Sequence, residues 1–156
     1  MKTVKQIVLA LAVLLTSSLA QTSNLPDFKL SDANKKPVQL ETLKGRPSVI
    51  VFWATWCGIC TSELPQLRQL ALEDKVPVFM LSVSDTKEDV LNFFNDFKVK
   101  GLQPLFARDG GDTPEAVGNR WRVRGQPEIF VLDAQANLIQ HHIGYTDIEE
   151  IRQELK

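Results

Sequence analysis

Cys57 and Cys60 are the only two cysteines in the 156-residue sequence, and they lie three positions apart. Residues at i and i+3 in the first turn of a helix share one face. Their Cα atoms can therefore adopt the separation of about 5.5 Å that a disulfide prefers. Such a bond closes a very short loop and adds little stability, because the stabilisation grows with loop length. The pair is better explained as a redox-active disulfide than as a structural one.

The two cysteines are expected to have different roles. A buried strand is predicted to end at Trp53, and a helix is predicted to begin near Cys57. Unpaired N–H groups and the positive end of the helix dipole favour a thiolate at that position, so Cys57 is the candidate nucleophile. Cys60 lies one turn further inside, where it is shielded, and would resolve a mixed disulfide with a substrate.

Metal binding is an alternative, because zinc sites use the same cysteine spacing. A closed zinc site needs four ligands, and only His141 and His142 are available as histidines. Adjacent residues of a strand point to opposite faces, so these histidines would not complete a site. No metal site is predicted. Copper handling stays open as an alternative function, because a reduced dithiol can bind soft Cu(I) transiently.

Residues 1–20 have the three parts of a secretory signal peptide. A positive head precedes an apolar run over residues 7–15, and Ser18 and Ala20 occupy the two positions that a signal peptidase reads. We predict cleavage after Ala20 and one mature domain over residues 21–156 in a periplasm or equivalent oxidising compartment. An uncleaved inner-membrane anchor is the alternative, although a spanning helix needs about 20 apolar residues.

The composition is that of an ordinary globular domain. Apolar residues make up 44% and charged residues 24% of the chain, which argues against disorder. The formal net charge is −1, so no basic excess points to a nucleic acid partner.

The hydrophobic pattern predicts the elements that hold the motif. Residues 48–53 form a continuous apolar run, which is typical of a central strand buried on both faces. Alternating or apolar runs predict further strands over residues 27–30, 38–40, 76–83, 102–107, 128–132 and 138–143. Periodicity and caps predict helices over residues 61–72, 87–97, 148–155 and a short segment from 114. This order predicts a three-layer α/β sandwich with a mixed sheet.

The chain resembles the thioredoxin superfamily in one segment, which reads Val51-Phe52-Trp53-Ala54-Thr55-Trp56-Cys57-Gly58-Ile59-Cys60 followed by Glu63-Leu64-Pro65. It is similar to the exported TlpA/ResA-like branch and the cytochrome c biogenesis thiol–disulfide oxidoreductases. The resemblance runs from about Leu25 to the C-terminus and includes a second segment, Gly125-Gln126-Pro127-Glu128-Ile129-Phe130. It implies the thioredoxin fold, an α/β/α sandwich with a central mixed sheet, and thiol–disulfide exchange.

The resemblance also assigns roles to residues near the motif. Pro127 resembles the cis-proline that faces the disulfide, and the backbone of Gln126 would pair with a substrate strand; a plain turn is the alternative. Pro65 resembles the proline that kinks the active-site helix. Trp56 lies beside the nucleophile and is predicted to shape the docking surface, with a core position as the alternative.

Glu63 matches a glutamate that this branch carries shortly after the second cysteine. Near the pair, a carboxylate would disfavour the thiolate or carry a proton; the alternative is an exposed first-turn glutamate that favours the helix dipole. Val51 replaces the buried aspartate of ordinary thioredoxins, and Gly58-Ile59 lacks the histidine of strong oxidants. Both departures favour a reductant or isomerase-type role.

The implied partners are exported cysteine-containing proteins, with apocytochrome c as one candidate, and a membrane thiol-reducing electron donor. A monomer is expected, with no cofactor beyond the redox-active disulfide. Three arginines precede the proline segment and are predicted to form a solvated face, with a docking patch for an acidic partner as the alternative: Arg120, Arg122 and Arg124.

Overall fold

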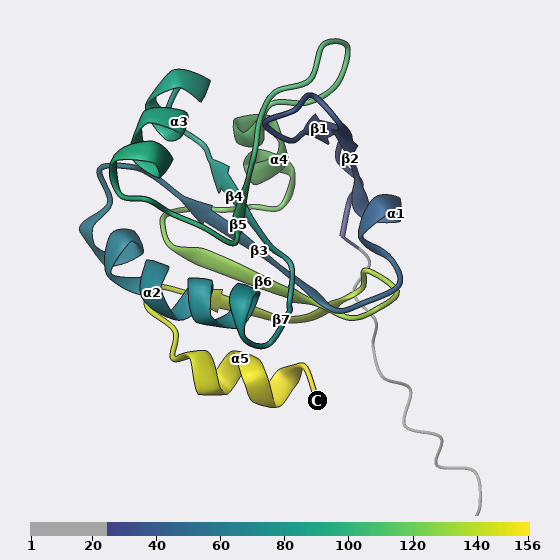
Figure 1. The fold of residues 1–156 in the computed structure, drawn as a ribbon. Coiled ribbons are helices and arrows are strands. Elements are labelled where there is room, and N and C mark those ends of the chain that lie inside the picture. The colour runs from purple at the N-terminus through teal and green to yellow at the C-terminus, as the bar shows by residue number, and fades with distance from the viewer. Residues whose placement is uncertain (1–24) are drawn as a thin grey trace, which may run out of the picture.

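The computed structural model describes residues 25–156, and the predicted signal segment lies outside them. The elements are β1 (Leu30–Ser31), β2 (Pro37–Val38), α1 (Leu40–Leu43), β3 (Ser48–Trp53), α2 (Gly58–Leu72), β4 (Val78–Ser82), α3 (Lys87–Asp96), β5 (Leu102–Leu105), α4 (Pro114–Arg120), β6 (Glu128–Leu132), β7 (Leu138–Ile143) and α5 (Ile148–Glu154). Helices cover both faces of the main sheet (Figure 1). The predicted α/β/α sandwich is confirmed. Within the described part of the chain, no helix is long and apolar enough to span a membrane.

Strand β3 is the centre of a five-stranded sheet with the order β5-β4-β3-β6-β7. β4 pairs with it in parallel and β6 pairs with it antiparallel, so the sheet is mixed. Every side chain from Ser48 to Trp53 is buried. This confirms that the continuous apolar run of the sequence is a strand with two covered faces.

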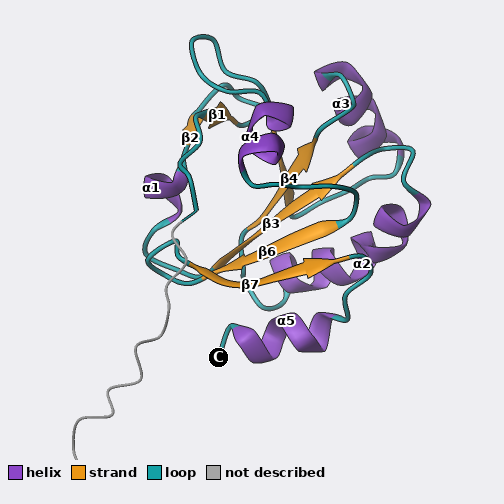
Figure 2. Cartoon of the chain, turned by 180° about the vertical axis from the view of Figure 1, so that it is seen from behind, coloured by secondary structure: helices purple, strands orange, loops and turns teal. Residues whose placement is uncertain are grey.

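Alternate residues of β3 point into two cores, one on each face of the sheet. On one face, Val51 and Trp53 pack with α2, α3 and α5. On the other face, Ile50 and Phe52 pack with α4 and the N-terminal segment that carries β1, β2 and α1. Figure 2 shows α5 beside α2 on the same side of the sheet. The end of β3 that leads into the cysteine motif is therefore fixed from both sides.

The N-terminal strands are shorter than predicted, and one residue predicted as strand is helical. Residues 38–40 were expected to be extended, but β2 covers only Pro37–Val38 and α1 begins at Leu40. A capping box between Gln39 and Thr42 starts this helix. The local side-chain hydrogen bonds of the cap decide the conformation here, because the alternating pattern is too short to do so.

The apolar face of α3 is only partly core. Val90 is buried, whereas Phe97, which the helical periodicity places on the same face, has 67% of its surface exposed. The helix ends at Asp96. The Phe97 ring therefore lies past the last turn and stacks on Phe93 with the ring centroids 4.5 Å apart.

Candidate active site

Cys57 and Cys60 form a disulfide at the start of α2, with their Cα atoms 5.2 Å apart. The helix begins at Gly58, earlier than the predicted residue 61, and Cys57 is its N-cap. The Cys57 sulfur accepts a hydrogen bond from the Cys60 N–H at 3.2 Å. Both cysteines lie at the positive end of the helix, the setting that stabilises a thiolate.

The two sulfur-bearing residues differ in exposure. Cys57 has 9% of its surface exposed and Cys60 has 2%. The neighbouring Trp56 and Ile59 are largely exposed, so the alternative of a core position for Trp56 is wrong. An incoming disulfide would meet Cys57 first, on a surface with apolar side chains on both sides of it.

The turn between β3 and α2 is anchored by the loop that follows β4. The carboxylate of Asp85 accepts hydrogen bonds from the backbone N–H and the hydroxyl of Thr55, each at 2.8 Å. The indole N–H of Trp56 donates to the Ser84 hydroxyl at 3.2 Å. Sequence reasoning missed Asp85; its signal is an acidic residue just after a buried strand that runs parallel to the strand before the motif.

Pro127 lies at the same edge of the sheet as the motif. The Gln126–Pro127 peptide bond is cis, as the resemblance predicts. In the antiparallel register between β3 and β6, Glu128 pairs with Phe52. Pro127 and Gln126 therefore continue β6 alongside the end of β3 that leads to Cys57. Within residues 25–156, the backbone N–H and C=O of Gln126 make no hydrogen bond.

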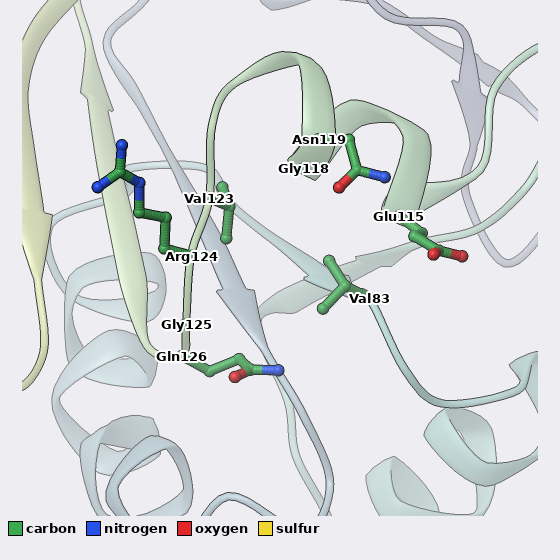
Figure 3. A pocket seen from close by; sticks show the side chains of 8 residues that line it. All are labelled: Val83, Glu115, Gly118, Asn119, Val123, Arg124, Gly125 and Gln126. Atoms are coloured by element: carbon green, nitrogen blue, oxygen red, sulfur yellow. The ribbon is translucent and has the colours of Figure 1, made fainter.

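A pocket of about 230 Å³ opens beside Gln126 (Figure 3). Asn119, Val83 and Val123 face one another across it, while the guanidinium of Arg124 points away (Figure 3). The pocket is lined by residues of α4, by the residue after β4 and by the loop of residues 121–127 that precedes β6, called the proline loop below: Val83, Glu115, Gly118, Asn119, Val123, Arg124, Gly125 and Gln126. A side chain of a polypeptide bound along Gln126 would have space here.

Glu63 is buried on α2, with 1% of its surface exposed, so the alternative of a solvated helix-face glutamate is wrong. One carboxylate oxygen accepts a hydrogen bond from the Thr146 N–H at 2.7 Å. The other oxygen has no hydrogen-bond partner among the described residues. Burial raises the pKa of Glu63 above its ordinary value, and the Thr146 N–H opposes that effect only in part. Such a group is suited to hold and transfer a proton.

Sequence reasoning did not single out Glu128 as a site residue. It is buried at the start of β6, with 1% of its surface exposed. One carboxylate oxygen accepts from the backbone N–H groups of Arg124, at 2.7 Å, and Gly125, at 3.1 Å. The available signal is a charged residue that opens an otherwise apolar strand directly after the predicted cis-proline.

The two adjacent histidines of β7 point to opposite faces, as predicted. His141 Nε2 lies 2.8 Å from the second carboxylate oxygen of Glu128, and the imidazole stacks on Phe130. His142 Nε2 lies 3.0 Å from the carboxylate of Glu154 on α5. No cluster of three or more potential metal-binding side chains occurs in the part of the chain that the structure describes.

The three arginines that precede Pro127 are exposed, as predicted. Arg120 belongs to α4 and forms an ion pair with Asp112 at 2.8 Å. Arg122 has a positive φ of 60° and lies in the turn that follows the helix. The arginines therefore do not form one strand face, because a helix end and a turn separate them.

Reversible oxidation of Cys57 and Cys60 is the chemistry that this arrangement supports, and a solved structure of a thiol–disulfide enzyme has the same fold. The chain superposes on a crystal structure of a thio-disulfide isomerase from Thermus thermophilus with a TM-score of 0.79 and 37% identity, covering 86% of this chain and 93% of that one. The protein is an oxidoreductase with the thioredoxin fold.

The chain belongs to the Redoxin family, whose model matches residues 20–155. It is 29% identical to the thiol-disulfide oxidoreductase ResA of Bacillus thuringiensis (strain Al Hakam), covering 84% of this chain and 74% of the relative. It is 30% identical to the thiol:disulfide interchange protein DsbE of Vibrio cholerae, covering 77% of this chain and 63% of the relative. The predicted TlpA/ResA-like identity and the thiol–disulfide oxidoreductase activity are confirmed.

Proposed function

We propose that this oxidoreductase works as a reductant of disulfides in exported proteins, in the periplasm or an equivalent compartment. The observation that carries the direction is the buried, partly unpartnered carboxyl group of Glu63 on the helix that bears both cysteines. A group that stabilises the Cys57 thiolate makes the couple more oxidising, whereas a nearby carboxylate opposes the thiolate. Gly58 and Ile59 add no charge or side-chain hydrogen bond that would favour it.

The reaction balances as a two-electron transfer. The Cys57 thiolate attacks a sulfur of the substrate disulfide, and the S–S bond of the substrate breaks as a mixed disulfide forms. The released substrate thiolate takes up a proton. Cys60 then loses its proton and attacks the Cys57 sulfur, which closes the Cys57–Cys60 disulfide and releases the second substrate sulfur as a thiolate. A thiol-reducing donor, proposed to lie in the membrane, would reduce the pair again.

The Glu63 carboxyl group is proposed to serve the proton transfers of this cycle. A group with a raised pKa can take the proton that leaves Cys60 and return it during the next reduction. The Thr146 N–H fixes one carboxylate oxygen and leaves the other available for the proton.

The experiment that tests the direction is a redox titration of the Cys57–Cys60 couple against dithiothreitol or glutathione. We expect a potential nearer the roughly −270 mV of thioredoxin than the roughly −120 mV of the oxidant DsbA. A value close to that of DsbA would rule out the reductant role and leave the oxidoreductase activity intact.

The compartment and the substrate are tested separately. Fractionation and N-terminal sequencing of the native protein should find a chain that begins at Gln21 outside the cytoplasm. Apocytochrome c before haem attachment is the proposed substrate within the class of exported cysteine-containing proteins. Deletion of the gene should then lower haem-stained c-type cytochromes, and a Cys57→Ser copy should fail to restore them.

A further inference from the structure

The carboxylate of Glu128 has a hydrogen-bond partner on each oxygen. The backbone N–H groups of Arg124 and Gly125 donate to one oxygen, and the imidazole of His141 contacts the other. Both oxygens of this buried acid therefore have partners, and all of these partners lie in the proline loop or in the neighbouring strand β7. The side chain of Glu128 therefore connects the loop to the sheet.

On its outer side, the loop has little support. A Cβ built on Gly125 would have no atom within 4 Å, and Arg124 is exposed. The pocket of Figure 3 opens beside this same segment. Among the described residues, the Glu128 carboxylate is the only hydrogen-bond partner of the Arg124 and Gly125 N–H groups.

The segment is also held at its other end. The carbonyl oxygen of Pro127 accepts a hydrogen bond from the Gly144 N–H at 2.8 Å. Gln126 lies between these two anchors, and its own N–H and C=O are left without a partner in residues 25–156. A strand edge that is fixed on both sides and unpaired in the middle is suited to receive an extended peptide.

We propose that Glu128 is a positioning residue for the polypeptide substrate: its carboxylate, oriented by His141, holds Arg124 and Gly125 so that the Gln126 backbone can pair with a substrate strand. This inference rests on the proposed function, because it concerns the substrate of the same disulfide. Glu128 makes no hydrogen bond to either cysteine. Its effect is therefore on the affinity for a peptide that must dock, through preorganisation of the loop.

The test compares two substrates in each variant. One is a disulfide-bonded peptide long enough to form a strand along Gln126, and the other is bis(2-hydroxyethyl) disulfide, which has no strand to dock. In Glu128→Ala the KM for the peptide should rise about tenfold, the effect of losing about 1.4 kcal/mol of binding. The rate with the small disulfide and the redox potential should stay at the wild-type values.

Two further variants separate positioning from general damage. In Glu128→Gln the side-chain carbonyl can still accept from both N–H groups, so the KM for the peptide should stay within about twofold of wild type. Glu154→Ala is the matched control, since it breaks the other histidine–glutamate pair of β7 without touching the loop. It should leave both substrates unaffected.

If Glu128→Ala does not fold, His141→Phe replaces it. A phenyl ring can keep the stack on Phe130 but loses the contact with the carboxylate, and a rise of about threefold in the peptide KM is expected. An unchanged KM for the peptide, or an equal loss of activity with both substrates, would overturn this inference and leave the proposed function standing. A wild-type protein that exchanges with neither substrate would overturn the proposed function as well.

Discussion

Two buried glutamates lie in segments of the site, Glu63 three residues after Cys60 and Glu128 directly after Pro127, and they differ in the hydrogen bonds that their oxygens accept. Glu63 and Glu128 each have 1% of their surface exposed. Glu63 has one partner, the Thr146 N–H, and one oxygen with none among the described residues. Glu128 has partners on both oxygens. Equal burial is therefore compatible with two different roles.

The difference follows from the cost of a buried charge. A buried carboxylate without enough hydrogen bonds is favoured in its protonated form, which makes it a store for a proton. A carboxylate that accepts several hydrogen bonds fixes the groups that donate to it. This difference supports the proposals of proton transfer for Glu63 and positioning of the proline loop for Glu128.

Both assigned roles depend on Cys57 as the nucleophile, and its removal has the largest expected effect. Cys57→Ser should abolish disulfide reduction, because no thiolate is left at the helix N-terminus. Cys60→Ser should accumulate a mixed disulfide with the substrate, because attack can occur but resolution cannot. Non-reducing electrophoresis after reaction with an oxidised protein substrate measures both outcomes. Selective alkylation of Cys60 in the reduced native protein would reverse the two assignments.

The next largest effect is expected from Glu128, whose two carboxylate oxygens both have hydrogen-bond partners. Glu128→Ala leaves two partly buried backbone N–H groups without a protein acceptor, at a cost of up to about 1–3 kcal/mol for each group. The free energy of unfolding from urea titration should fall by about 2–5 kcal/mol, and Glu128→Gln should lose much less. If the free energy of unfolding falls no more in Glu128→Ala than in Glu154→Ala, the role of the Glu128 carboxylate in holding the proline loop is contradicted.

Glu63 should instead make stability depend on pH. Its pKa is raised in the folded protein above the ordinary value of 4.5, so the folded state binds more protons than the unfolded state between those two pKa values. The free energy of unfolding should therefore fall as the pH rises through that window and stay lower above it. Glu63→Gln should remove this decrease. Urea titrations of both proteins at a series of pH values from 4 upward measure the free energy of unfolding. If this free energy depends on pH in the same way in wild type and Glu63→Gln, the prediction is wrong.

The same substitution tests the coupling of Glu63 to the cysteines. With the carboxylate removed, Glu63→Gln should have a lower Cys57 pKa and a higher reduction potential than wild type. Thiol alkylation as a function of pH and a redox titration give the two values. Glu128→Gln serves as the control, because that carboxylate is assigned to the loop. Equal shifts in both variants would remove the distinction between the two glutamates.

The smallest effect on stability is expected at Trp56, which has 67% of its surface exposed and one side-chain hydrogen bond. Trp56→Phe should change the free energy of unfolding by no more than about 0.5 kcal/mol. The KM for a peptide disulfide should nevertheless rise, since the exposed indole is assigned to the docking surface. An unchanged KM would return Trp56 to the role of a simple surface residue.

The amino-acid sequence determined the features that depend on short-range geometry. The cysteine spacing, the buried run of β3 and the helix caps all operate within a few residues of one another. Thr113 and Asp147 cap α4 and α5, with side chains that accept hydrogen bonds from the N–H groups of Ala116 and Glu149. The identity of the fold and the cis bond before Pro127 followed from the resemblance of two short segments.

Tertiary structure decided what the carboxylates do. The Thr146 N–H, which donates to one carboxylate oxygen of Glu63, is 83 residues away in sequence. His141 reaches Glu128 only because β6 and β7 pair across a turn. Periodicity indicates which residues face the core, but it does not show how many hydrogen-bond donors meet there. That number sets the free energy of a buried charge. The sequence therefore pointed to Glu63, whereas only the folded chain revealed Glu128 and distinguished the two glutamates.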